Sequence, residues 1–476
     1  MPFNDNREFV AALEKTGDAV RIQKEVDWDL EASAITGRSC ETSGPACLFE
    51  KLKYYHEGGR ILGAPVATYR RMAAALGMPV TSKTKDIFDE WEERVAKPVK
   101  PVVVKDGPCK EIKVTGDDVD LYQFPVPVIH NGDGGRYIGS WHCVITKHPD
   151  SGWTNWGMYR LMVYNRNTIS GYLRPYSHFG MALEKYESKG LPMPVAVAIG
   201  PDPICAMVAA SPFRIGEDEV DFAGALREKP VELVKAETND LLVPAHAEII
   251  LEGEILPGVK LLEGPFGEFP GYRTQGSSPQ PVFKIKTITH RKNPIICMSP
   301  EGVGISDGKI GPSIAGALGM KERLKRHGIP VGDVCIPGEM GSLVAVISVK
   351  KSDPVMAEKI TSILHGRRVS VPKLIIVNDD IDVFDISEVA HALGDRLHPI
   401  RGVTTNPNST GWTLVPYLSR EERESDHVAS AVWDCTWPAN WSKESDIPVR
   451  MSFKTSYPEE MQERVKKQWK EYGFKK

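Results

Sequence analysis

The spacing of hydrophobic residues changes along the chain, from a helical pattern near the N-terminus to short β-rich runs farther on. Near the N-terminus, apolar side chains recur at helical spacing, and Asn4 or Asp5 can cap the first helix. The proline-containing stretch 97–101 predicts a stiff, extended connector after these helices. We therefore expect an N-terminal α/β region over residues 1–108. Its helices are predicted at residues 5–16, 69–76 and 85–95.

The pattern changes to short β-rich runs over residues 109–305. Gly, Pro, Asn and Asp separate these runs, which favours a barrel-like or split β-sheet. Two helical segments are inserted in it, at residues 181–189 and 217–227. The strands are predicted at residues 141–145, 161–164, 195–199, 247–251 and 282–286.

A linker helix and a smaller α/β domain complete the predicted architecture. Within residues 306–330, a helix is expected to end at Gly328 and Pro330. Strand and helix then alternate over residues 331–476. The charged segment 458–472 is predicted to be a helix that is either exposed to solvent or forms an arm onto a partner subunit. The fold class is thus α/β (α+β) with a central split β-barrel. The remaining elements are expected at residues 314–327, 342–349, 354–364, 373–377 and 387–393.

Composition narrows the class of protein. A chain of 476 residues predicts two or three domains, and 41% hydrophobic with 26% charged residues is typical of a globular protein. The net charge of −4 gives no basic field for nucleic acid. The chain starts without a signal-peptide pattern and has no apolar run that could span a membrane, so we expect a cytoplasmic protein, by its size an enzyme. Its eight cysteines include no C-x-x-C pair and are expected to be reduced thiols.

Two acids stand close together in the run from Glu263 to Glu268. The Gly-Pro-Phe-Gly segment between them cannot form a regular helix, because Pro265 lacks an N–H and glycine favours a turn. Two carboxyl groups on one tight turn can divide roles, one ionised beside a cation and the other a proton donor. The alternative is a surface turn with solvated acids.

Further candidate groups lie upstream. Asn155, Gly157 and Arg160 at the mouth of a strand suit an anionic ligand, and the alternative is a strand edge with a solvated arginine. His178 stands alone, which is more typical of a structural histidine than of a ligand. Glu219 begins an acidic helix, where the helix dipole alone favours a carboxylate. Spacing does not connect these groups with the two acids.

Taken together, these segments resemble the UbiD family of decarboxylases, which use prenylated flavin mononucleotide (prenylated FMN). The match looks closest to the ferulic (phenylacrylic) acid decarboxylase branch and covers nearly the whole chain. An Asn…Arg…His series upstream of Glu-Gly-Pro-Phe-Gly-Glu is highly specific. The resembling segments are Trp153-Thr154-Asn155-Trp156, the run from Lys235 to Pro244, the run from Glu263 to Glu268, and Trp469-Lys470-Glu471-Tyr472-Gly473.

The resemblance implies roles by position. Arg160, Glu263 and Glu268 match the family's catalytic triad, with Arg160 binding the substrate carboxylate and Glu268 donating the proton. The other implied sites are a divalent metal, usually Mn²⁺, a monovalent cation, usually K⁺, the flavin, and the substrate wall. The divalent metal falls on Asn155, His178 and Glu219, and the monovalent cation on Trp156, Ala210, Ser211 and again Glu219. The flavin falls on Met158, Tyr159, Arg160 and Ser177, and the substrate wall on Phe269 and Pro312.

The activity implied is the reversible, non-oxidative decarboxylation of an aromatic, heteroaromatic or aryl-acrylic acid. A rival of the same class is a carboxylase that runs in reverse, or one subunit of a multi-subunit complex. A rival of another class is a non-catalytic flavin-binding chaperone or scaffold subunit. The implied partners are a homodimer or higher homo-oligomer, built by the C-terminal α/β domain, and a flavin prenyltransferase that supplies the cofactor. No membrane or nucleic-acid partner is expected.

Overall fold

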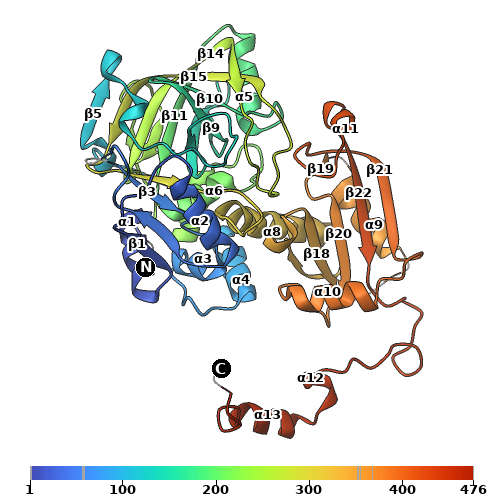
Figure 1. The fold of residues 1–476 in the computed structure, drawn as a ribbon. Coiled ribbons are helices and arrows are strands. Elements are labelled where there is room, and N and C mark those ends of the chain that lie inside the picture. Colours follow the sequence, from blue (N-terminus) through green and yellow to red (C-terminus); the bar gives the residue numbers. More distant parts are fainter. Residues whose placement is uncertain (1–2, 56–58, 351–352, 354, 367, 475–476) are drawn as a thin grey trace.

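The computed structural model describes residues 3–55, 59–350, 353, 355–366 and 368–474. It combines a helical and β-sheet N-terminal region, a large curled sheet, a linker helix, and a C-terminal α/β domain from which an arm extends (Figure 1). This is the mixed α/β architecture that the hydrophobic pattern predicts. Within these ranges, no helix is long and apolar enough to cross a membrane.

The N-terminal region packs helices on a small sheet with the strand order β1-β2-β3-β16. Asp5 caps the first helix by accepting a hydrogen bond from the Glu8 N–H at 2.9 Å, as its sequence position predicts. The last strand, β16 (Ile295–Met298), comes from far along the chain and pairs in parallel with β3. The other elements are α1 (Asn6–Thr16), β1 (Ala19–Ile22), α2 (Glu31–Glu41), β2 (Ala46–Phe49), β3 (Arg60–Gly63), α3 (Tyr69–Ala75) and α4 (Thr84–Val95).

The central sheet runs in the order β6-β9-β10-β15-β14-β11-β7-β8, with β5 paired to β15. Its longest strands form a hairpin, and Pro257 and Gly258 lie where the register of that hairpin shifts. The sequence predicted β14 at residues 247–251; the strand starts two residues later and continues to Glu263, so it delivers that acid to the site. The strands are β5 (Ile112–Thr115), β6 (Tyr137–Gly139), β7 (His142–Lys147), β8 (Thr154–Gly157), β9 (Leu161–Asn165), β10 (Thr168–Gly171), β11 (Met193–Ile199), β14 (Ile249–Glu263) and β15 (Ser278–His290).

Helices and a small second sheet flank the curled sheet. The apolar side chains inside the curled sheet form one hydrophobic core together with Phe179 of α5. Helix α6 packs in a second hydrophobic core, which continues into the N-terminal region and the C-terminal domain. The flanking elements are β4 (Val102–Val103), β12 (Glu232–Lys235), β13 (Leu242–Pro244), α5 (His178–Ser188), α6 (Pro203–Ala210) and α7 (Glu219–Arg227).

The linker helix α8 (Gly311–Arg326) crosses from the central sheet to the C-terminal domain (Figure 1). The sheet of that domain has the order β17-β18-β20-β22-β21-β19. The buried Ile314, Ala317 and Leu324 of α8 join the core that unites the domains. The domain's elements are β17 (Val331–Cys335), β18 (Val344–Val349), α9 (Met356–His365), β19 (Arg368–Val369), β20 (Lys373–Asn378), α10 (Ile386–Asp395), β21 (Val403–Gly411), α11 (Arg420–Glu424) and β22 (His427–Asp434).

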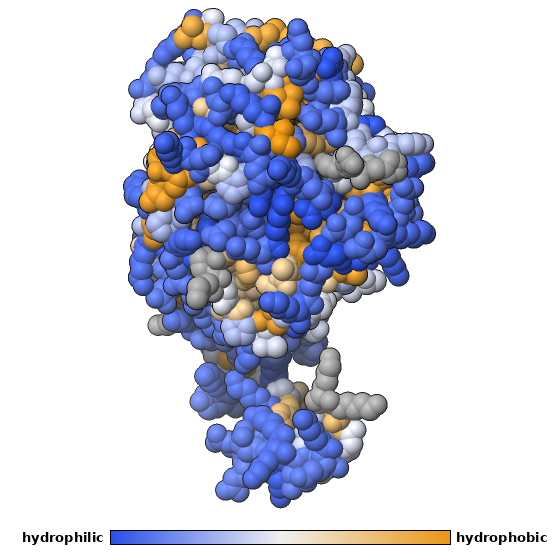
Figure 2. Space-filling view, turned by 90° about the vertical axis from the view of Figure 1, so that its left-hand side faces the viewer, coloured by the Kyte–Doolittle hydropathy of each residue, from blue (hydrophilic) through white to orange (hydrophobic). Residues whose placement is uncertain are grey.

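An arm follows β22 and projects away from the body of the molecule (Figures 1 and 2). It contains α12 (Phe453–Ser456) and α13 (Glu459–Lys467). The helix predicted over residues 458–472 extends five residues too far at its C-terminal end, because the chain turns after Lys467 and the Trp469 ring stacks on Phe474 with 3.9 Å between ring centroids. All eight cysteines are free and buried, as the sequence predicts.

Candidate active site

One guanidinium lies between two carboxylates at the edge of the central sheet. Arg160 follows β8, and its Nε and Nη2 donate to Glu263 Oε1 and Oε2 at 2.9 and 2.8 Å. Its Nη1 donates to Glu268 Oε1. Glu263 is the last residue of β14, and Glu268 lies in the loop that leads to β15. The two acids predicted on one turn thus share a cation that is 103 residues distant from Glu263 in sequence.

This cluster is removed from water. The Glu263 side chain is fully buried, and those of Arg160 and Glu268 are 7% and 11% exposed. Burial raises the pKa of Glu268, although the Arg160 charge opposes that shift. Burial alone would lower the pKa of Arg160, but the hydrogen bonds to Glu263 and the charge of Glu268 raise it overall. The two acids therefore differ: Glu263 holds the bidentate ion pair, and Glu268 retains its proton to higher pH than a solvated glutamate.

Aromatic residues that belong to no predicted motif, Tyr137 and Tyr172, complete the cluster. The Tyr137 hydroxyl donates to Glu263 Oε1 at 2.9 Å, and its ring packs on Phe266. Burial, reinforced by the charge of Glu263, raises the pKa of Tyr137, so the phenol stays a neutral donor. The Arg160 guanidinium lies 4.4 Å from the Tyr172 ring centroid. Glu263 thus accepts hydrogen bonds from both Arg160 and Tyr137.

A second group of polar side chains gathers beside β8. Glu219 Oε2 accepts from the Trp156 N–H at 2.9 Å, and Glu219 Oε1 lies 3.6 Å from His178 Nδ1, too far for a hydrogen bond. Asn155 is buried, and in the described part of the chain its Nδ2 has no partner. The unpaired atom is the amide nitrogen, which does not coordinate a cation; a divalent cation would instead bind the amide Oδ1 together with the imidazole and the carboxylate, donor types that suit such an ion. Among the described residues no group of three His, Cys, Asp or Glu side chains could hold a metal ion, so a site here would need the Asn155 amide as a further donor.

The remaining residues expected at the flavin and at the monovalent cation lie on several elements. Tyr159 is partly buried and packs against Phe179, with 5.1 Å between ring centroids, and desolvation raises its pKa to about 12. Ser177 caps α5, accepting from the Gly180 N–H at 3.1 Å. Met158 is partly buried beside the main core. Ala210 ends α6, and Ser211 is its C-cap.

The C-terminal domain reaches this part of the molecule through Trp412. Phe269 follows Glu268 and meets the Trp412 ring edge-on at 5.4 Å, so the residue expected at the substrate wall contacts the C-terminal domain. Pro312 lies in the first turn of α8.

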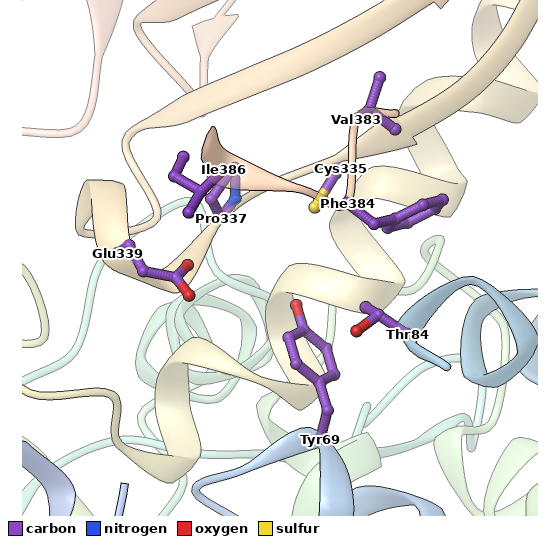
Figure 3. Close-up of a pocket in the computed structure, with 8 residues that line it drawn as sticks. All are labelled: Tyr69, Thr84, Cys335, Pro337, Glu339, Val383, Phe384 and Ile386. Atoms are coloured by element: carbon purple, nitrogen blue, oxygen red, sulfur yellow. The ribbon is translucent and has the colours of Figure 1, made fainter. Parts of the chain in front are cut away.

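Two cavities lie close to these elements without being lined by the predicted site residues. The smaller separates α3 and α4 from the C-terminal domain, with Tyr69 pointing from the N-terminal side toward Cys335 and Glu339 (Figure 3). The larger, of about 720 Å³, lies between α2 and the loop that carries Glu268, and Gly267 and Gly271 contribute to its wall. The outer face of the acidic turn therefore borders open space, whereas its inner face holds the ion pairs.

The buried cluster predicts a pH-dependent loss of stability on removing the cation. In Arg160→Met, two buried carboxylates lose their partner, which costs about 3–5 kcal/mol at pH 8. Without the opposing charge of Arg160, burial raises the pKa of Glu268 further above that of the unfolded chain, so the lost stability returns as the pH falls through it. Thermal unfolding from pH 5 to 8 measures this effect. Arg214→Met, which removes an exposed ion pair with Glu322, serves as the control, and an equal, pH-independent loss in both variants would contradict the prediction.

Comparisons with known proteins identify the family. Three domain families of 3-octaprenyl-4-hydroxybenzoate carboxy-lyase match the chain: the N-terminal domain at residues 10–91, the Rift-related domain at 100–303, and the C-terminal domain at 314–435. Pyrrole-2-carboxylic acid decarboxylase of Pseudomonas aeruginosa is 34% identical over 99% of this chain and 98% of its own. Ferulic acid decarboxylase 1 of Saccharomyces cerevisiae is 30% identical over 100% of this chain and 99% of its own.

Solved structures agree with these relatives. The UbiD-class enzyme HmfF from Pelotomaculum thermopropionicum, in complex with FMN, matches with a TM-score of 0.82 and 30% identity, over 94% of this chain and 97% of its own. Vanillic acid decarboxylase of Sedimentibacter hydroxybenzoicus in its closed form matches with a TM-score of 0.86 and 29% identity, over 99% and 100% of the two chains. The resemblance drawn from the sequence is thereby confirmed: this chain belongs to the UbiD family of carboxy-lyases.

Proposed function

We propose that this protein catalyses the reversible, non-oxidative decarboxylation of an aromatic, heteroaromatic or aryl-acrylic acid, with prenylated FMN as its cofactor. The observation that carries the proposal is Arg160 held between Glu263 and Glu268 in a buried cluster. The names of the relatives support the substrate class, since they include decarboxylases of pyrrole-2-carboxylic and ferulic acids. An HmfF structure in complex with prenylated FMN supports the cofactor.

Each member of the cluster has a distinct task in this proposal. Arg160 binds the substrate carboxylate, and Glu263, held by Tyr137, fixes the guanidinium. The carbon–carboxyl bond breaks, CO₂ leaves, and Glu268 donates its proton to the carbon that keeps the electron pair. Solvent then returns a proton to Glu268. When bound, prenylated FMN supplies the electron-accepting ring that makes the bond cleavage accessible.

Asn155, His178 and Glu219 would hold a divalent metal such as Mn²⁺, and this set of one amide, one imidazole and one carboxylate suits it. Backbone carbonyls of Trp156, Ala210 and Ser211, with Glu219, would hold K⁺. Both cations would balance the charge of the cofactor phosphate. The flavin would contact Met158, Tyr159 and Ser177, the first two of which precede Arg160 directly and the last of which precedes His178.

Two rival functions make different demands on these residues. A carboxylase, or a subunit of a multi-subunit complex, needs the same cluster, and the equilibrium with bicarbonate decides between the directions. A flavin-binding chaperone or scaffold subunit needs no proton donor. The raised pKa of Glu268 favours an enzyme, because a buried protonated carboxyl group is what proton donation requires.

Glu268→Gln tests the enzyme proposal directly. The protein is produced alongside a flavin prenyltransferase, and CO₂ release is followed over a panel of acids. We expect the variant to lose at least about 100-fold in rate, as is typical for removal of a general acid, with the flavin absorbance spectrum retained. In the wild type, the rate should fall as the pH rises through the elevated pKa of Glu268, because only the protonated carboxyl donates.

Glu254→Gln is the matched control, since Glu254 lies on β14, the strand that precedes the loop of Glu268, and pairs with Lys286. Unchanged turnover in Glu268→Gln would refute the proposed proton donor.

His178→Ala tests the metal group. We expect Mn²⁺ and the flavin to be lost together, because both would depend on the same cluster. Metal content by mass spectrometry and flavin content by absorbance measure the two losses. His391→Ala changes an exposed histidine of α10 and should keep both. Retention of metal and flavin in His178→Ala would remove this histidine from the proposed ligands.

We also propose that the C-terminal domain and its arm form a homodimer or a higher homo-oligomer. The arm exposes apolar side chains that make few contacts with the body, including Val449 at 76% and Met451 at 79% exposure. Such side chains are expected to be covered by a partner subunit. A dimeric HmfF variant among the structural relatives supports the same expectation.

Deleting residues 449–476 should lower the oligomeric state while leaving the rest of the chain folded. Sedimentation velocity measures the mass, and thermal unfolding checks the fold. The double substitution Val449→Ser and Met451→Ser should weaken self-association in the same direction. An unchanged mass after the deletion would exclude the arm from the interface.

A further inference from the structure

Glu268 has to regain a proton after each turnover of the proposed reaction. While the substrate and the flavin are bound, they would keep bulk water away from the side on which the proton leaves. The guanidinium of Arg160 occupies another side, because its Nη1 donates to Glu268 Oε1. Among the described residues, no hydrogen bond is made to the second carboxyl oxygen, Oε2. The returning proton therefore needs a separate approach to Glu268.

Such an approach is open on the side of α2, where the cavity of about 720 Å³ reaches the loop of Glu268. Gly267 and Gly271, on either side of Glu268 in the sequence, both contribute to the cavity wall. Glu301, in the loop that follows β16, lines the same cavity. Val303 on that wall is 75% exposed, so water has access to the cavity. The cavity thus brings solvent to a carboxyl group beside the loop that carries Glu268.

The loop of Glu301 packs directly against the loop of Glu268. The Gly271 N–H donates to the Glu268 carbonyl at 2.8 Å, which closes a tight turn with Gly271 at a φ of 90°. A Cβ at Gly271 would lie 3.1 Å from Val303 N and 3.2 Å from the Gly302 carbonyl carbon. The two backbones are therefore in contact immediately beyond the two acids.

The electrostatics of Glu268 agree with this proximity. Burial raises the pKa of Glu268, the charge of Arg160 opposes that rise, and the charge of Glu301 adds to it. The effect of Glu301 exceeds that of Glu263, although Glu263 is bound to the same guanidinium as Glu268. Glu301 therefore lies within the range over which one carboxyl group acts on another.

The Glu301 carboxyl group is held by groups that tolerate both of its protonation states. Ser299 Oγ donates to Oε1 at 2.9 Å, and Ser306 Oγ donates to Oε2. A hydroxyl can turn from donor to acceptor, so these contacts can persist when Glu301 is protonated. The buried Lys309 ammonium fixes the loop by donating to the carbonyls of residues 302–304, the nearest at 2.6 Å. The titratable groups that face Glu301 are Glu268, Cys40, Asp307 and Lys309.

We propose that Glu301 is the relay through which Glu268 regains its proton from the cavity beside α2. This inference rests on the proposed function and adds one step to it. An acid in the cavity solvent protonates Glu301, Glu301 passes a proton to the Glu268 carboxylate, and Glu301 is a carboxylate again. The net change is one proton moved from solvent to Glu268. Glu301 acts through Glu268 and does not touch the substrate.

Glu301→Gln tests the relay, because glutamine keeps the size of the side chain but cannot take up and release this proton. The variant is loaded with prenylated FMN, CO₂ is removed as it forms, and each protein is measured at the pH of its highest kcat/KM. We expect kcat to fall about tenfold or more and kcat/KM to change by less than about twofold. The reason is that kcat/KM ends at the first irreversible step, CO₂ release, before Glu268 is reprotonated. An unchanged kcat, or an equal loss in kcat and kcat/KM, would overturn the relay.

Glu41→Gln is the matched control, since Glu41 lines the same cavity and forms an exposed ion pair with Arg38. It should keep both kinetic constants. The same loss of kcat in Glu41→Gln and Glu301→Gln would assign the effect to the cavity as a whole and exclude a specific role for Glu301.

Infrared spectroscopy tests the coupling of the two acids without turnover. The band of the protonated Glu268 carboxyl group, identified by its absence in Glu268→Gln, is titrated in the FMN-loaded protein. Glu301→Gln should move its midpoint to lower pH, because a negative charge that raises the pKa of Glu268 is removed. An unchanged midpoint would separate the two acids and reject the relay. If the wild type releases CO₂ from no acid, the proposed function fails, whereas this titration still decides whether Glu301 is coupled to Glu268.

Discussion

The buried ion pair between Arg160 and Glu263 is the constraint around which this site is arranged. Three separate pieces of the central sheet must meet for it to exist: the connection after β8, the end of β14, and β6, which brings the Tyr137 hydroxyl. A carboxylate without access to water is tolerated only when its lone pairs are satisfied, and Glu263 achieves this through Arg160 and Tyr137. The curled shape of the sheet makes that meeting possible, because a flat sheet would keep β6 and β14 apart. The chemistry proposed for Glu268 depends on this arrangement, since the same guanidinium serves both acids.

Because one cation serves two acids, their difference arises from their surroundings. Glu263 closes a strand and receives hydrogen bonds from two side chains, whereas Glu268 sits in a loop and has one nitrogen partner, Nη1 of Arg160. Burial raises the pKa of Glu268, whereas the hydrogen bonds from Arg160 and Tyr137 fix the orientation of the Glu263 side chain. In the proposed function, this division would supply one side chain that orients the arginine and one acid that gives up a proton.

The sequence predicted the helices and strands to a different extent from the candidate active site. Long segments with a clear period, such as α4 and β11, were predicted closely, because burial of one face fixes their pattern. The four-residue strands β1 to β3 were missed, since so short a strand shows hardly any alternation. The turn that joins Glu263 to Glu268 was visible in its glycines and proline, but its partner Arg160 was not, because pairing across 103 residues depends on strand order. The ligand sets of the metals and the flavin came from family resemblance alone. Tyr137, Tyr172 and Trp412 had no local signal at all.

The position of Trp412 brings the C-terminal domain into contact with the candidate active site. Its ring contacts Phe269 on one side and the Arg174 guanidinium on the other, so it joins the acidic turn of the central region to a positive charge. The domain is anchored independently of these contacts, through the apolar face of α8 and the core that α8 shares with the N-terminal helices. Since the anchoring does not use the site, substitution at the seam can alter what the site recognises without unfolding the domain. In the proposed function, the chemistry would stay constant at Arg160, Glu263 and Glu268, while residues on the C-terminal side would help to determine which acid is accepted.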